Sequence, residues 1–154
     1  MKVLFMPAQG QCLFDRFVAS ITGGEFCHVE IILQLDESQA DLYTGAPEVR
    51  LSSVWGENVK CIPSGEIPRG WTYLDLGAVE NEEAVREAMQ CIGKPYGKFC
   101  ALASPFADLS GEQTCCSLLV LHILKKCIQV PLRKGSPNDL FRHLAQWYIP
   151  RVYT

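Results

Sequence analysis

Cysteine and histidine are the residues of this 154-residue chain that could support nucleophilic catalysis, and the chain has eight cysteines and three histidines. No two cysteines are spaced as Cys-x-x-Cys, so the spacing predicts neither a structural zinc site nor a thioredoxin-like redox motif. The apolar start of the chain reaches only to Pro7, too short for a signal peptide. We therefore expect a cytoplasmic protein whose thiols are reduced and mostly buried.

Cys115 and Cys116 occupy the position where a thiol would be most reactive. They follow Thr114 at the start of a predicted helix over residues 115–127. At a helix N-terminus the free backbone N–H groups and the positive end of the dipole stabilise a thiolate, and the same groups can bind an oxyanion. The alternative is that both cysteines are core residues at the start of a helix.

The three histidines differ in their ability to act as a base for this thiol. His122 lies six residues beyond Cys116 on the same predicted helix, about 9 Å along the axis, and cannot reach it. His143 falls within the last predicted helix, where a half-buried surface position is expected. His28 remains, on the polar face of a predicted strand together with Glu30. The alternative for His28 is an ordinary solvent-facing strand residue.

Two strands and a helix are predicted to position His28. An apolar run over residues 3–6 predicts the first strand, and helical spacing ended by Gly23 and Gly24 predicts a helix after it. Over residues 27–35 the odd positions are all apolar and the even ones are mixed, which is typical of a strand with one core face and one polar face. The apolar positions of the helix are Leu13, Phe14, Phe17, Val18 and Ile21.

The middle of the chain predicts an antiparallel meander, because short β-type runs alternate with turns rich in glycine and proline. These runs cover residues 41–44, 49–54, 58–62 and 71–74.

The rest of the chain predicts helices. Asn81 can cap a helix that ends before Gly93, and residues 96–113 are expected to be a loop. The cysteine-bearing helix is apolar on most sides and is therefore expected to be central and buried. Ser136 as the cap and Pro137 as the first residue predict a last helix through about Trp147.

A block of strands followed by helices predicts one α+β domain over residues 1–154. The formal net charge is −3 and no run of basic residues exceeds a pair, so no nucleic-acid partner is expected. No apolar stretch approaches the roughly 20 residues of a membrane span. Nucleotide-binding loops, calcium loops and metal-binding helices are absent from the sequence, and no cofactor or metal is expected.

Five segments in order resemble the permuted NlpC-type thiol hydrolases of the papain fold, the family that includes YiiX-like bacterial proteins and viral relatives. Residues 17–31, FVASITGGEFCHVEI, resemble the helix, Thr-Gly turn and histidine strand of that family. Residues 49–51 resemble the next strand, and residues 93–97, GKPYG, a Gly-x-x-Tyr turn. Residues 116–120, CSLLV, resemble the nucleophile helix, and residues 136–140, SPNDL, the closing motif.

The resemblance implies a circularly permuted papain-like fold, in which an antiparallel sheet or small barrel packs against a central cysteine-bearing helix. It implies Cys116 as the nucleophile, with its own backbone N–H at the oxyanion hole, and His28 as the general base. Cys115 becomes its neighbour beside the site, and Tyr96 matches a family tyrosine near the site.

The third catalytic residue departs from the family pattern. Glu30 shares the face of His28 and has a carboxylate suited to orienting an imidazole, so it is the first choice. Thr44, beside Tyr43 on the expected next strand, is the second choice, and Glu48 is the third.

The leading function is a cysteine hydrolase that cleaves an amide, isopeptide or ester bond through a thioacyl-enzyme intermediate. One alternative is a thiol acyltransferase, since related permuted folds resemble lecithin retinol acyltransferase. Another is a binding module with an incomplete catalytic set, its groove filled by Trp55 or Trp71. Peptides of the peptidoglycan type, ubiquitin-like tails and acyl lipids all remain possible substrates, because the loops expected to choose among them, residues 36–70 and 97–113, have no recognisable motif.

Overall fold

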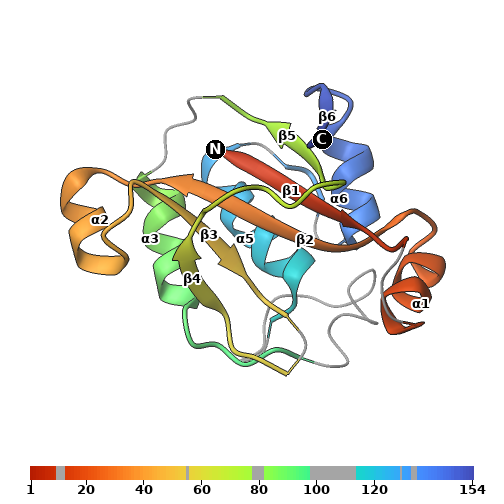
Figure 1. Ribbon diagram of the computed structural model, residues 1–154, viewed down its shortest axis with the longest axis horizontal. Helices are drawn as coiled ribbons and strands as arrows, with labels where there is room; N and C mark the ends of the chain where they lie inside the picture. Colours follow the sequence, from red (N-terminus) through yellow and green to blue (C-terminus); the bar gives the residue numbers. More distant parts are fainter. Residues whose placement is uncertain (10–12, 55, 78–81, 98–113, 129, 133–134) are drawn as a thin grey trace.

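Six antiparallel strands and five helices form the described part of the chain, an α+β fold (Figure 1). The computed structural model describes residues 1–9, 13–54, 56–77, 82–97, 114–128, 130–132 and 135–154. The predicted cap Asn81 and most of the predicted loop over residues 96–113 lie outside these ranges.

The strands form one sheet in the order β4-β3-β2-β1-β5-β6. Consecutive strands β2, β3 and β4 are neighbours, as a meander requires, whereas β5 leaves the meander and pairs with β1 on the other side. The order has two ends, so the described strands form an open sheet and not a small barrel. The strands are β1 (Lys2–Pro7), β2 (Phe26–Gln34), β3 (Glu48–Ser52), β4 (Lys60–Pro63), β5 (Thr72–Asp75) and β6 (Pro150–Val152).

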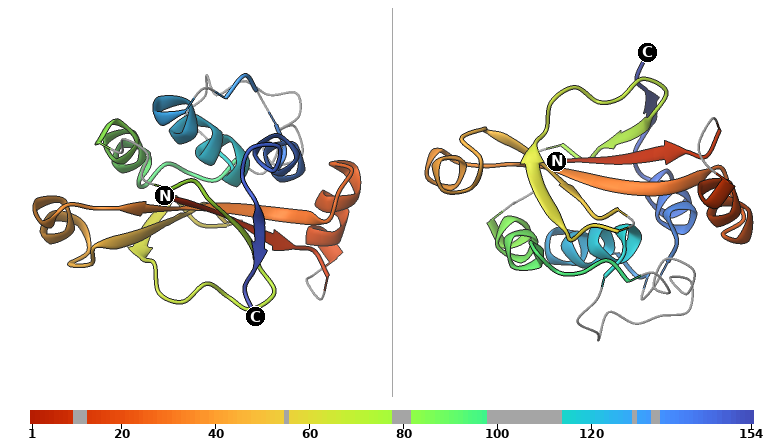
Figure 2. Two further views of the ribbon diagram at one scale, coloured as in Figure 1. Left: turned by 90° about the horizontal axis from the view of Figure 1, so that it is seen from above. Right: turned by 60° about the horizontal axis from the view of Figure 1, so that its bottom comes forward.

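The helices occupy three places around the sheet. Figure 2 shows α3, α5 and α6 on one face, while α1 and α2 lie at opposite ends of the sheet. The helices are α1 (Leu13–Ile21), α2 (Glu37–Tyr43), α3 (Glu82–Cys91), α5 (Cys116–Cys127) and α6 (Pro137–Leu144). The predicted glycine stop of α1 is confirmed, since Gly23 adopts a φ of 67° and the amide of Gly24 closes the helix on the carbonyl of Ala19 at 3.1 Å.

Two predictions of local structure are wrong. Residues 41–44 were predicted as a β-type run, but they belong to α2 and its C-cap. The reason is a capping box, in which Asp36 accepts from the Gln39 amide at 2.8 Å and the Gln39 side chain accepts from the Asp36 amide at 3.2 Å. The last helix ends at Leu144, three residues before Trp147, and the chain turns to form β6.

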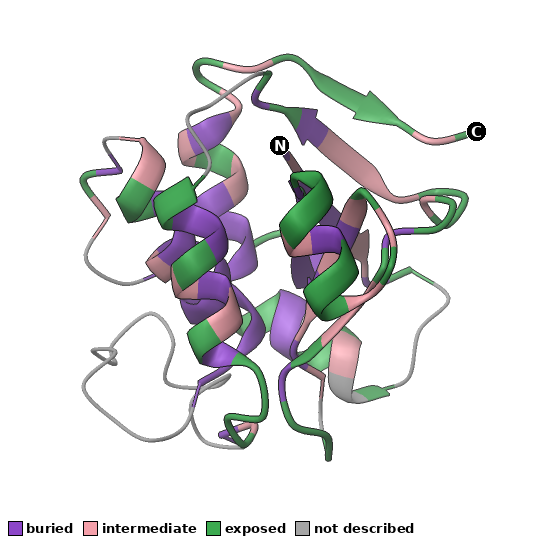
Figure 3. Cartoon of the chain, turned by 90° about the vertical axis from the view of Figure 1, so that its left-hand side faces the viewer, coloured by how far each residue is buried: buried purple, intermediate pink, exposed green. Residues whose placement is uncertain are grey.

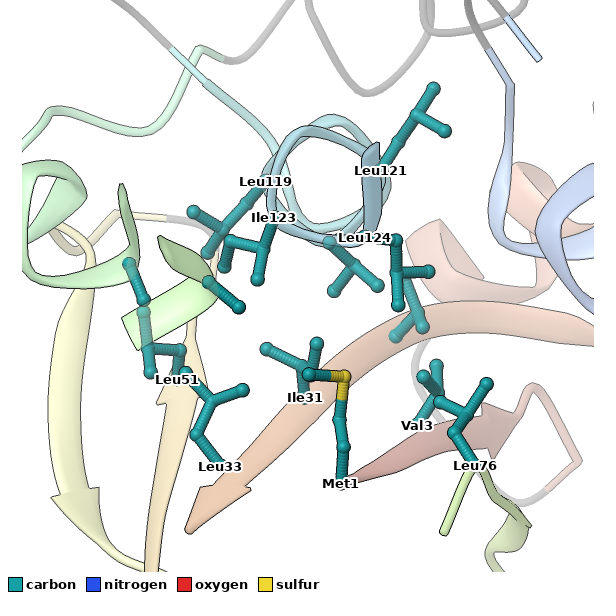
Figure 4. Close-up of a cluster of buried hydrophobic side chains, with 14 of the residues drawn as sticks. Met1, Val3, Ile31, Leu33, Leu51, Leu76, Leu119, Leu121, Ile123 and Leu124 are labelled. Atoms are coloured by element: carbon teal, nitrogen blue, oxygen red, sulfur yellow. The ribbon is translucent and has the colours of Figure 1, made fainter. Parts of the chain in front are cut away.

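The core lies between α5 and the sheet. One side of β2 contributes Val29, Ile31 and Leu33, and Figure 4 shows α5 above this side of the sheet with Leu119, Ile123 and Leu124 directed toward it. All eight residues Cys116 to Leu121, Ile123 and Leu124 of α5 are buried, so the predicted central helix is confirmed. Figure 3 shows the contrast with α2, nearest the viewer, which is largely exposed.

Candidate active site

His28 and Glu30 lie on the side of β2 opposite its core-facing residues. This side was expected to be a polar face of the strand, but eight of the nine residues of β2 are buried, and His28 and Glu30 retain only 7% and 5% exposure. Both side chains line a cavity of about 360 Å³. A histidine and a carboxylate are therefore held in a largely desolvated site.

Cys116 is the first residue of α5 and lines the same cavity. Cys115 precedes the helix as its N-cap with extended backbone (φ −132°, ψ 171°), and its carbonyl accepts the first helical bond, from Leu119, at 2.9 Å. The backbone N–H of Cys116 thus belongs to the first turn, where N–H groups have no partner within the helix.

Cys115 was predicted to line the site, and this prediction is wrong. Its side chain has no exposed surface, lies 3.8 Å from the hydroxyl of Ser117, and is not part of the cavity wall. Cys115 is an extended N-cap whereas Cys116 is the first helical residue, and of the two adjacent thiols only that of Cys116 lines the cavity.

The side chains of Cys116, His28 and Glu30 lie together on the cavity wall. The Nε2–H of His28 donates to Oε1 of Glu30 at 3.2 Å, and Cys116 is close enough to the imidazole for its charge to raise the pKa of His28. Because Nε2 is directed to Glu30, Nδ1 is the ring nitrogen left for the thiol. This is the relation of nucleophile, base and orienting group on which thiol catalysis depends.

The electrostatics of the chain favour a charged imidazole. Burial lowers the pKa of His28, but the charge of Cys116 and its hydrogen bond, and then those of Glu30, outweigh burial and raise this pKa to about 10. Burial likewise raises the pKa of Glu30, but the hydrogen bond and charge of His28, with smaller contributions from Ser52 and Arg50, lower it below its ordinary value. Glu30 is therefore an anion at neutral pH, and His28 beside it is a cation.

On the β3 side of β2, the residues before His28 have no paired strand among the described residues, and a side chain binds their backbone instead. Within the described residues β3 pairs with β2 over residues 31–34, whereas β1 pairs along nearly all of β2. At Phe26 the side chain of Asn138 accepts from the amide at 3.0 Å and donates to the carbonyl at 2.8 Å. The same amide group donates to Thr22 Oγ1 at 2.7 Å, so α6 fixes the strand two residues before His28.

Gly24 is required by this contact. A Cβ atom at residue 24 would lie 2.1 Å from Oδ1 of Asn138, far inside van der Waals contact. Asn138 itself is 3% exposed, which leaves it no room to move aside. The predicted cap of α6 is confirmed as well, since the Ser136 hydroxyl accepts from the Asp139 amide at 3.2 Å.

Among the described residues, two aromatic ones lie on the cavity wall with other apolar and polar side chains. Tyr96 lines the cavity, as the resemblance implied. Trp71 lines it too, with its ring edge-on to that of His28 at 6.2 Å, and leaves the cavity open; Trp55 lies outside the described residues. The other described wall residues are Met6, Asp15, Val18, Cys27, Arg50, Val54, Pro68, Ser117 and Pro137.

Thr44 and Glu48 do not reach this site. Thr44 is the C-cap of α2, beyond the far end of β2, because residues 41–44 are not a strand beside His28. Glu48 begins β3 opposite Gln34, also at the far end, and contacts Lys2, Gln34 and Ser64. Of the three candidates for the orienting residue, Glu30 alone lies against His28.

Arg50 and Asn138 are site residues that sequence reasoning missed. Arg50 places its Nε 3.3 Å from Oε2 of Glu30. The position of Arg50 between the apolar residues Val49 and Leu51 indicated a polar side of β3. That this side lies next to Glu30 follows only from the pairing register of β3 with β2. Asn138 had no comparable signal, since its partner Phe26 is 112 positions away in sequence.

Comparisons with family models, with curated proteins and with solved structures gave no match to this chain. Within the described ranges, no three histidine, cysteine or acidic side chains gather as metal ligands. None of the helices that the structure describes has the length and apolar character needed to cross a membrane.

Proposed function

We propose that this protein is a cysteine hydrolase that cleaves an amide, isopeptide or ester bond through a thioacyl-enzyme intermediate. The observation that carries the proposal is the convergence of Cys116, His28 and Glu30 on the wall of one open cavity, with His28 hydrogen-bonded to Glu30 at 3.2 Å. A thiol at a helix start, a base and an orienting carboxylate rarely converge on a cavity for packing reasons alone.

In the proposed mechanism the proton of Cys116 already resides on His28 before the substrate binds, and the thiolate attacks the substrate carbonyl. Because the pKa of His28 is about 10, the imidazolium keeps this proton at neutral pH until it donates the proton to the leaving group. Water then attacks the thioester, with His28 now acting as base, and the acid and the free thiol are released. Glu30 orients the ring through Nε2 and stabilises its positive charge throughout.

The first turn of α5 supplies the electrostatic part of the mechanism. The tetrahedral intermediate carries a negative oxygen, and the backbone N–H of Cys116 and the positive end of the helix are positioned to stabilise it. A preorganised donor of this kind contributes about 100-fold or more to the rate.

The fold that we propose with this function is a circularly permuted papain-like one. The support is the order of the parts: the strand bearing His28 precedes the helix bearing Cys116, and this helix packs on an antiparallel sheet. Papain-like enzymes with the unpermuted order have the cysteine helix first.

Selective alkylation tests the nucleophile. At pH 7 we expect iodoacetamide to label Cys116 well before the other cysteines, because burial raises the pKa of the Cys61, Cys91 and Cys127 thiols. Peptide mass mapping of the native protein after brief labelling identifies the modified residue. Cys115→Ser is the matched control, since it removes the adjacent thiol and should leave fast labelling intact, whereas Cys116→Ser should abolish it.

Activity-based probes with peptide, isopeptide and lipid acyl groups test the reaction. We expect a thioester on Cys116 that turns over to free acid, with at least about a hundredfold loss of turnover in His28→Ala. Transfer of the acyl group to an added amine or alcohol in preference to water would instead indicate an acyltransferase. Stable labelling of a thiol other than Cys116 would rule out the assignment.

A further inference from the structure

Arg50 is a cation on the cavity wall that the proposed mechanism does not use. Its neighbours Val49 and Leu51 on β3 have no exposed surface and belong to the core, so Arg50 projects to the opposite side of the strand. There it lines the same cavity as Cys116 and His28.

The guanidinium of Arg50 has unused hydrogen-bonding capacity. Within the described part of the chain its partner is Glu30, through Nε at 3.3 Å from Oε2. The Nε atom is fully buried, so the 19% exposure of the side chain belongs to its other atoms. A guanidinium has five N–H donors, and none of them makes a hydrogen bond to a described residue, because the Nε contact with Glu30 is an ion pair without hydrogen-bond geometry.

The remaining charges near the nucleophile are already paired. Oε1 of Glu30 accepts from His28 and its Oε2 faces Arg50, so the carboxylate is shared by two cations. Arg50 belongs to β3, which pairs with the edge of β2 away from β1 (Figure 1). A substrate anion is thus attracted to the β3 side of the cavity.

We propose that Arg50 binds a carboxylate of the substrate, and that the enzyme acts on amides or peptides that carry a carboxylate close to the scissile carbonyl. The terminal nitrogens of arginine match the two oxygens of a carboxylate and bind it through two parallel hydrogen bonds. This inference deepens the proposed function and rests on Cys116 as the nucleophile.

Two alkylating reagents of nearly equal size test the proposal on the full-length chain. The thiolate of Cys116 displaces iodide from both iodoacetate and iodoacetamide, so that a bond from sulfur to the CH2 carbon forms as the carbon–iodine bond breaks, but only iodoacetate brings a carboxylate to the cavity. We expect Arg50→Gln to lower the ratio of the iodoacetate rate to the iodoacetamide rate about tenfold, in line with the loss of a charge-assisted hydrogen bond. Dividing by the iodoacetamide rate removes any change in the reactivity of the thiol itself.

Two further variants separate the recognition from simple charge. Arg50→Lys retains the charge without the planar fork, and it should lower the ratio about threefold; this variant decides the matter if Arg50→Gln does not fold. Lys60→Gln removes an exposed cation on β4 and should leave the ratio unchanged. A reactive Cys116 whose ratio is the same in wild type, Arg50→Gln and Arg50→Lys would overturn the role of Arg50 alone. A Cys116 that reacts with neither reagent would overturn the proposed function as well.

Discussion

Glu30 is the residue on which the charges of the site converge. Its two carboxylate oxygens face His28 at 3.2 Å and Arg50 at 3.3 Å, although it retains only 5% exposure. A buried carboxylate is stable as an anion only when cations and donors replace the water it has lost. The same anion holds the imidazolium of His28, so the two groups stabilise each other's charged form.

Glu30→Gln should lower the pKa of His28 from its value of about 10, since the glutamine amide accepts a hydrogen bond but lacks the charge that favours the imidazolium. The imidazolium would then lose its proton at lower pH, and the alkaline limit of catalysis should move down with it. An NMR titration of the His28 ring measures the shift directly.

Glu48→Gln is the matched control, because Glu48 lies at the far end of the sheet and should leave this titration unchanged. An unchanged His28 titration in Glu30→Gln would contradict the role given to Glu30.

The residues of the site were predictable to different degrees. Helix position and the resemblance pointed to Cys116, and the two-residue repeat of a strand placed His28 and Glu30 on one face. Arg50 and Asn138 were not predictable, because their partners are defined by strand register and by a contact across most of the chain. Local patterns in a sequence do not encode such long-range contacts.

At the level of elements, the patterns with strong periodicity were the reliable ones. The buried stripe of α5 and the alternation along β2 predicted both elements within a residue or two. The prediction of a strand over residues 41–44 is wrong because these residues follow the capping pair Asp36 and Gln39, which starts a helix. This pair is visible in the sequence. The strand β6 was missed since all three of its residues are exposed and show no alternation.

The contact between the α1–β2 turn and α6 gives a prediction at this level. Gly24→Ala should destabilise the protein by several kcal/mol, because the added methyl group overlaps Oδ1 of Asn138. Asn138→Ala should cost about 1–3 kcal/mol by leaving the Phe26 amide and carbonyl without their partner. Urea unfolding measures both free energies.

The two changes should not be additive. In the Asn138→Ala background the methyl group of Gly24→Ala meets no amide and only the Cβ of residue 138, at 2.9 Å, so its additional cost should be smaller than in wild type. Full additivity would show that the two residues act independently. Asn58→Ala, at an exposed asparagine, is the control and should be close to neutral.

For the molecule as a whole, one core supports both the sheet and the cysteine-bearing helix α5. The side chains beneath α5 belong to the same cluster as Cys116 at its start. Changes in this core are therefore expected to affect stability first and the position of the thiol second.

A matched pair of leucines measures the contribution of this core. Leu119→Ala, at a residue with 1% exposure on α5, should lower the free energy of unfolding by about 2–5 kcal/mol. Leu42→Ala, at a residue with 72% exposure on α2, should change it by less than about 0.5 kcal/mol. Denaturant titrations of both variants give the comparison, and equal losses would contradict the assignment of the core.

The closure of β2 by Asn138 has a consequence for the order in which the protein is made. His28 is synthesised early, but the side chain that fixes its strand arrives 112 residues after Phe26. Contacts so distant in sequence form late, because the intervening chain must lose its freedom before they form. A ribosome-bound chain that still lacks α6 thus contains Cys116, His28 and Glu30 without the contact that fixes the strand of the histidine. We expect these three side chains to reach their final arrangement only after α6 has packed against β2.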